Sequence, residues 1–85
     1  MKVIVQPGFF LVKTKPNKET INQAVLNTSK EYTVTATSVS PIIGIEVGDI
    51  VVIPEEYQPT EYFEINGEHC AKFREINVSL IFKQR

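Results

Sequence analysis

The residues best suited to chemistry are an adjacent histidine and cysteine and a group of glutamates in the second half of the chain. His69 and Cys70 are neighbours, so in an extended strand their side chains point to opposite faces and cannot act together as base and nucleophile. The glutamates are Glu55, Glu56, Glu61, Glu64 and Glu68. Paired carboxylates can serve acid–base catalysis or bind a hard cation, but so short a chain encloses no dry cleft. We therefore expect a solvated acidic edge, no catalytic residue and no enzyme.

Length, charge and cysteine content limit the class of protein. The 85 residues suffice for one domain, residues 1–85. Cys70 is the only cysteine and His69 the only histidine, so we expect no disulfide within the chain, no zinc site and no other cofactor. Nine basic and ten acidic residues give a net charge of -1, which argues against nucleic-acid binding because such binding depends on neutralising phosphates. We expect no signal peptide and no membrane span, since no apolar run approaches about 18 residues, and we expect a cytoplasmic protein without a membrane partner.

Alternating apolar residues and turn residues predict an all-β chain folded as a small barrel. In the segment 32–39, Tyr32, Val34 and Ala36 alternate with threonines, which predicts that the threonines face outward. Asn66 and Gly67 favour a tight hairpin, since both central residues of a type I′ turn need positive φ. The predicted strands are 2–6, 9–13, 32–39, 50–53, 61–65, 68–73 and 78–82.

Residues 13–30 do not fit this strand pattern and leave two interpretations open. Thr20 and Gln23 match a capping box, which predicts a short helix that packs on the barrel through Ile21, Ala24 and Val25. The alternative is a mobile polar loop whose apolar plug, Ala24-Val25-Leu26, inserts into a hydrophobic groove on a partner.

Several motifs resemble those of the GroES-like co-chaperonins. In the second half of the chain, Val47-Gly48-Asp49-Ile50-Val51, Tyr57, the acidic hairpin and Phe73-Arg74-Glu75-Ile76-Asn77 follow one another with nearly the family's spacing. The first half has the family's order of a short strand pair, a long loop ending in a hydrophobic tripeptide, and an outgoing strand. The resemblance therefore covers nearly the whole chain.

The chain departs from the family pattern in three places. Asn22 and Gln23 stand where the family usually has paired glycines before the tripeptide. The stretch 39–47 is too short for the β-hairpin that roofs the dome in longer members. The usual Pro-Leu-x-Asp-Arg entry is replaced by Gln6-Pro7-Gly8-Phe9-Phe10. We expect a shortened roof and an altered first turn.

The resemblance implies a co-chaperonin subunit that forms a homo-heptamer and caps a GroEL-like chaperonin ring, with the ATPase chemistry left to that partner. The implied partner-binding residues lie in the mobile loop: Ile21, Ala24, Val25 and Leu26. Both terminal strands are apolar, and such unprotected edges favour pairing with neighbouring subunits in a closed ring. The expected interface residues are Val3, Val5, Val78, Leu80 and Phe82.

A small OB-like barrel that binds single-stranded nucleic acid is the alternative function. Such barrels bind bases on aromatic side chains with cations nearby. The residues that could serve in this way are Tyr57, Tyr62, Phe63, Lys72, Phe73 and Arg74. Core packing explains most of these aromatic residues equally well, and the near-neutral charge makes this interpretation the second choice.

Overall fold

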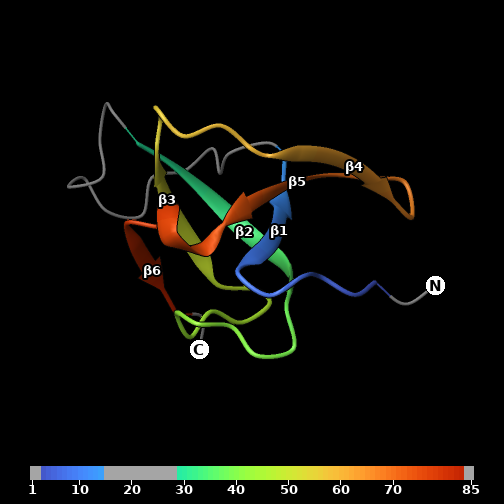
Figure 1. Ribbon diagram of the computed structural model, residues 1–85. Coiled ribbons are helices and arrows are strands. Elements are labelled where there is room, and N and C mark those ends of the chain that lie inside the picture. The colour runs from blue at the N-terminus through green and yellow to red at the C-terminus, as the bar shows by residue number, and fades with distance from the viewer. Residues whose placement is uncertain (1–2, 15–28, 84–85) are drawn as a thin grey trace.

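A computed structural model describes residues 3–14 and 29–83 of the chain. Its six strands form one antiparallel sheet in the order β4-β5-β1-β2-β3-β6 (Figure 1). The elements are β1 (Phe9–Lys13), β2 (Ser29–Thr37), β3 (Ile50–Pro54), β4 (Glu61–Ile65), β5 (Glu68–Arg74), the 3-10 turn η2 (Glu75–Asn77) and β6 (Leu80–Phe82). The all-β class expected from the sequence is confirmed. Among the described residues, no helix is long and apolar enough to cross a membrane.

The hairpin between β4 and β5 forms where the sequence predicts it. Asn66 has φ of 52° and Gly67 has φ of 81°, the left-handed backbone that a type I′ turn requires and that asparagine and glycine tolerate best. Around this turn Ile65 lies opposite Glu68, and Glu61 lies opposite Lys72. The turn thus fixes the register of the whole hairpin.

Strand β3 confirms the expectation from its continuous β-branched run. Val51, Val52 and Ile53 are at most 1 % exposed, so side chains on both faces of the strand are covered. The strand lies between β2 and β6, which satisfies its backbone on both sides. Covering on both faces explains why its sequence does not alternate.

Strand β2 contains an irregularity that the sequence pattern did not predict. Val12 lies opposite Val34, but Leu11 lies opposite Ala36, so Thr35 is an extra residue in β2. Such a bulge moves the following side chains to the other face of the sheet. Ala36 therefore lies on the side of Leu11, and its predicted place beside Tyr32 and Val34 was wrong.

The two terminal strands are shorter than expected. Residues 3–8 contain no strand and only an isolated parallel bridge between Val5 and Ser38. A turn follows, in which the Phe9 amide donates to the Gln6 carbonyl at 3.2 Å. At the other end, the strand predicted over 78–82 is confined to β6, because η2 precedes it and ends at Asn77.

The core lies inside the curved sheet and centres on Phe10 and Phe73, whose ring centroids are 6.3 Å apart. Tyr32 packs against Phe73 at 5.3 Å. The other buried members come from β1, β2, β3, β5 and the segment before β3: Val12, Val34, Ile45, Val51, Ile53 and Ala71. Val78 and Ile81 pack against this cluster from the far edge, so the sheet must curl for its two ends to share one core.

We expect Phe73→Ala to lower the free energy of unfolding by about 3–5 kcal/mol, because it removes the ring that both Phe10 and Tyr32 contact. Urea denaturation at one protein concentration measures the loss. Phe63→Ala, at a ring that is 39 % exposed, is the control and should cost no more than about 1 kcal/mol. Equal losses in the two variants would show that Phe73 is not the centre of the core.

Candidate functional site

The histidine and cysteine lie as the strand geometry predicts. Cys70 is 2 % exposed, and its Sγ lies 3.9 Å from Thr35 Oγ1. His69 is exposed on the opposite face of β5. The two side chains thus share no site, and no group of three His, Cys, Asp or Glu in the described residues is arranged to hold a metal ion.

The glutamates of the hairpin lie on its solvent-exposed surface. Glu61, Glu64 and Glu68 are all exposed. Glu61 Oε1 pairs with Lys72 Nζ at 3.0 Å, and Glu68 Oε2 lies 3.9 Å from Lys13 Nζ. Exposed pairs of this kind contribute little to stability, and they form an acidic edge rather than an enclosed pair of carboxylates.

The sheet ends in two open edges, β4 and β6, and the predicted interface residues lie near β6 and the N-terminal segment. Among the residues that the structure describes, β6 pairs only with β3. Leu80 on this strand is 49 % exposed, Phe82 is partly buried, and Val78 packs on the core. Such an edge leaves backbone donors and acceptors free to pair with another chain.

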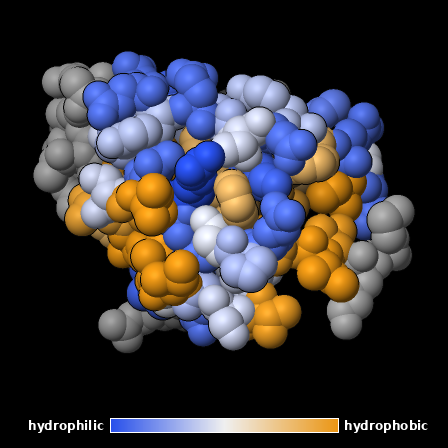
Figure 2. Space-filling model, viewed as in Figure 1, coloured by the Kyte–Doolittle hydropathy of each residue, from blue (hydrophilic) through white to orange (hydrophobic). Residues whose placement is uncertain are grey.

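The N-terminal segment lies on the other side of the molecule. Val3 is 39 % exposed, whereas Val5 is 6 % exposed and therefore buried within the chain. Figure 1 shows this segment on the opposite side from β6. In Figure 2, hydrophobic surface gathers at these same two margins, where Ile4 and Ile76 are 79 % and 78 % exposed. The predicted interface residues thus lie at two separate margins of the molecule, where Val3 and Leu80 are exposed and Val5 is buried.

The segment 39–47, where longer members of the resembled family have a roof hairpin, contains no strand. A buried carboxylate holds it in place: Glu75 Oε1 accepts the amides of Ile42 at 2.7 Å and Ile43 at 3.0 Å. Glu75 is only 1 % exposed, and its own amide donates to the Gly8 carbonyl at 2.8 Å. Glu75, the first residue after β5, thus ties the segment 39–47 to the first turn.

A second tie joins the segment to the residue after β6. Lys83 Nζ lies 2.7 Å from Asp49 Oδ2, and it donates to the Gly44 carbonyl at 2.9 Å. Asp49 Oδ2 also accepts the Glu46 amide at 2.9 Å. The hydrogen bond to Asp49 raises the pKa of Lys83, so the ammonium stays charged. Lys83 therefore links the segment 39–47 to the end of β6.

Sequence reasoning missed these two carboxylates as positioning groups. Asp49 stood in the Val-Gly-Asp motif that marks the start of β3, but its partner Lys83 is 34 positions away. Glu75 stood in the turn before the last strand, 33 positions from Ile42. A pattern of local spacing carries no signal for contacts at such separations.

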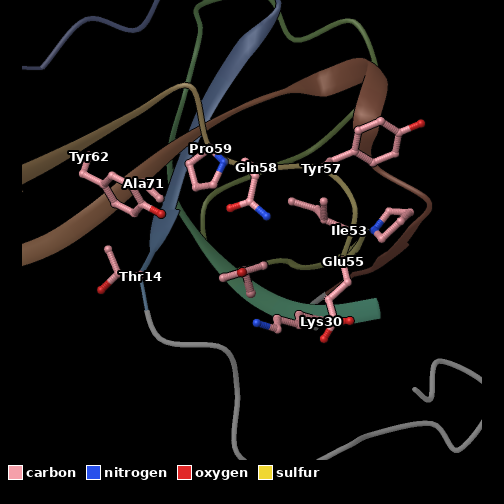
Figure 3. Close-up of a pocket in the computed structure, with 11 residues that line it drawn as sticks. Thr14, Lys30, Ile53, Glu55, Tyr57, Gln58, Pro59, Tyr62 and Ala71 are labelled. Carbon is pink, nitrogen blue, oxygen red and sulfur yellow. The ribbon is translucent and has the colours of Figure 1, made fainter. Parts of the chain in front are cut away.

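A pocket of about 190 Å³ lies at the end of the sheet where β1 finishes and β2 begins (Figure 3). The chain's three tyrosines, Tyr32, Tyr57 and Tyr62, all line it, and we call it the tyrosine pocket. Burial raises the pKa of Tyr32, and the nearby Tyr62 and Glu55 raise it further. The Tyr32 hydroxyl is therefore neutral throughout the physiological range.

The predicted partner-binding residues Ile21, Ala24, Val25 and Leu26 lie in 15–28, outside the described residues. The two ends of this segment are anchored to the sheet. The Thr14 amide donates to the His69 carbonyl at 3.1 Å, and Ser29 lies opposite Pro54 in the pairing of β2 with β3.

The residues considered for nucleic-acid binding do not share one surface. Phe73 is 1 % exposed in the core and cannot stack on a base. Tyr57 and Tyr62 line the tyrosine pocket. Lys72 lies on the other face of the sheet, 4.5 Å from the centre of the Phe9 ring and paired with Glu61.

No protein-family model and no curated protein matches the sequence. The fold, the two edges and the order of motifs are therefore the basis for a functional proposal.

We expect Glu75→Ala to release the segment 39–47, because the Ile42 and Ile43 amides lose their shared acceptor. A buried donor left without a partner costs about 1–3 kcal/mol, so stability should fall by at least about 1 kcal/mol. Hydrogen exchange of the Ile42 and Ile43 amides should accelerate. Glu75→Gln keeps one oxygen acceptor and should have a smaller effect. Unchanged exchange in Glu75→Ala would contradict this role.

Proposed function

We propose that the protein is a co-chaperonin subunit of the GroES-like type, which assembles with copies of itself into a closed ring and caps a chaperonin ring. The observation that carries this proposal is the unpaired outer edge of β6, on the opposite side of the subunit from the exposed N-terminal segment (Figure 1). A surface and its complement on opposite sides of one subunit produce head-to-tail contacts. When the rotation between neighbours closes, such contacts form a ring.

The chemistry of the two surfaces supports a head-to-tail contact. The β6 side carries the exposed side chains of Ile76 and Leu80, and the N-terminal side carries those of Val3 and Ile4. Pairing the edge of β6 with a neighbour's N-terminal segment removes both apolar surfaces from water and satisfies the free backbone groups. The resemblance implies seven subunits.

Assembly also answers a stability problem. A domain of this size buries only about 60 % of the surface that its unfolded chain exposes. Without a disulfide, the stabilisation must come from the core and from neighbouring copies. In the proposed ring, each subunit is stabilised at two edges.

In this proposal, the segment 13–30 carries the contact with the chaperonin through Ile21, Ala24, Val25 and Leu26. Burying a few modest apolar side chains yields only a few kcal/mol at about 25 cal/mol per Å², and ordering the segment offsets part of this gain. A single copy therefore binds weakly. A ring presents several copies, so each later contact is intramolecular and the ring binds far more tightly than one subunit.

The proposal assigns no catalytic residue to this chain. The lid closes a chamber in which another protein folds, while the chaperonin binds and hydrolyses ATP. The His69–Cys70 pair and the hairpin glutamates have no part in this function, in keeping with their positions on separate or exposed surfaces.

We expect Leu80→Asp to convert a ring into monomers, because it places a charge on the apolar free edge of β6. Light scattering coupled to size-exclusion chromatography, at micromolar concentration, measures the mass. His69→Asp adds the same charge at an exposed side chain on β5, which pairs with β4 and β1 rather than with β6 or the N-terminal segment, and it should leave the ring intact. A wild-type protein that is monomeric, or a Leu80→Asp variant that still assembles, would contradict the proposed interface.

We expect Leu26→Asp to abolish capture by a nucleotide-loaded chaperonin while leaving the fold and the ring intact. A pull-down with and without nucleotide measures capture, and light scattering measures assembly. Asn27→Asp adds the same charge at the next residue without removing an apolar side chain, so it should retain most of the capture. Unfolding of Leu26→Asp would instead support the helix interpretation of 13–30, and unchanged capture would place the contact elsewhere.

A further inference from the structure

The tyrosine pocket collects polar groups that the proposed lid function does not use. Besides the three tyrosines, its lining includes Thr14, Lys30, Glu55 and Gln58. These residues come from the end of β1, the start of β2 and the loop between β3 and β4. Three segments that are distant in sequence thus bring hydroxyl, amide, ammonium and carboxylate groups to one small space.

The side chains of this pocket are available to a ligand. Within the described part of the chain, the side chains of Tyr32, Tyr62, Lys30 and Gln58 form no hydrogen bond or ion pair. Lys30, Gln58 and Tyr62 are exposed, so water solvates these polar groups until a ligand displaces it. In Figure 3, the Tyr62 ring and the Gln58 amide project toward the centre of the pocket, whereas the Tyr57 hydroxyl points outward.

The geometry favours hydrogen bonding over ring stacking. Tyr32 packs against Phe73, with ring centroids 5.3 Å apart, so the core occupies one side of its ring. Because burial raises the pKa of Tyr32, its hydroxyl is protonated and can donate a hydrogen bond. An aromatic cage for a cation needs several free ring faces around one centre, whereas here the Tyr57 side chain points away from the centre of the pocket (Figure 3).

The charges of the lining select the kind of ligand. Lys30 supplies one positive charge, and Glu55 supplies one negative charge near Tyr32. A single carboxylate can pair with the Lys30 ammonium and accept further bonds from hydroxyl and amide donors, since it has about four acceptor sites. A dianion such as phosphate meets stronger repulsion from Glu55. A cavity of about 190 Å³ also fits one side chain rather than a large molecule.

We propose that the tyrosine pocket is a binding site for a carboxylate side chain of a polypeptide partner, held by the Lys30 ammonium and the hydroxyls of Tyr32 and Tyr62. Thr14 and Gln58 supply the remaining donors. The site belongs to one subunit and needs neither a ring nor a chaperonin, so this inference stands apart from the proposed function. The bound carboxylate thus contacts both β2, through Lys30 and Tyr32, and the loop after β3, through Gln58.

The chain itself reports on this site, because it contains no tryptophan and its three tyrosines all line the pocket. We expect N-acetylglutamate amide, titrated at constant ionic strength, to change the tyrosine fluorescence in a saturable way. It should also shift the amide resonances of Lys30 and Gln58. The uncharged N-acetylglutamine amide should produce no saturable change.

Variants of the lining separate the contributions of charge and hydroxyl. Lys30→Gln should weaken binding at least about tenfold, since it removes a charged hydrogen-bond donor. Tyr32→Phe removes one hydroxyl and should weaken binding about fivefold. The control is Lys13→Gln, which removes the same charge from a lysine outside the pocket lining, and it should leave binding unchanged. Circular dichroism shows whether each variant is folded.

Three outcomes would overturn the proposal. The first is a fluorescence that does not respond to N-acetylglutamate amide, and the second is an equal response to the glutamine amide. The third is tighter binding of inorganic phosphate than of the carboxylate, which would identify a site for a dianion. If Lys30→Gln fails to fold, the resonance shifts of the wild-type protein still decide, because a carboxylate bound elsewhere leaves Lys30 and Gln58 unshifted.

Discussion

The structure depends on one packing constraint, that a single core must be enclosed by a six-stranded sheet that curls without closing. Phe10 and Phe73 lie at its centre, while Ile81 reaches the same core from the far edge of the sheet. The curvature brings the two ends of the sheet around one interior, yet β4 and β6 each keep an unpaired side. Open edges of this kind must be protected or used. The proposed ring uses the edge at β6.

Two buried carboxylates adapt this frame to a short chain. Where a longer protein has room for a hairpin, the segment 39–47 is fastened by Glu75 on one side and by the pair of Asp49 with Lys83 on the other. Both carboxylates stand next to a strand of the sheet: Glu75 directly follows β5, and Asp49 directly precedes β3. The segment therefore gains a defined position without strand pairing of its own. Its exposed apolar side chains, Val39, Ile42 and Val47, are held at the outside.

Features that depend on local chemistry could be predicted from the sequence, and features that depend on distant contacts could not. The Asn66–Gly67 turn and the covered run of β3 follow from backbone preferences and from the β-branched pattern. The bulge at Thr35 depends on how β2 meets β1, and it reversed the expected side of Ala36. The tyrosine pocket needs three segments that only the fold brings together, although its Tyr57 was already singled out by the family resemblance.

A disulfide test addresses the head-to-tail contact most directly. In a Cys70→Ser background, Val3→Cys and Leu80→Cys place one thiol on each proposed surface. The N-terminal segment and β6, which carry these positions, lie on opposite sides of the chain (Figure 1). Because a disulfide requires Cα atoms within about 7 Å, the pair can join only different subunits. Under mild oxidation, the account predicts a ladder of disulfide-linked oligomers on a denaturing gel, with each single-cysteine variant giving nothing larger than a dimer. Monomers alone in the double variant would contradict it.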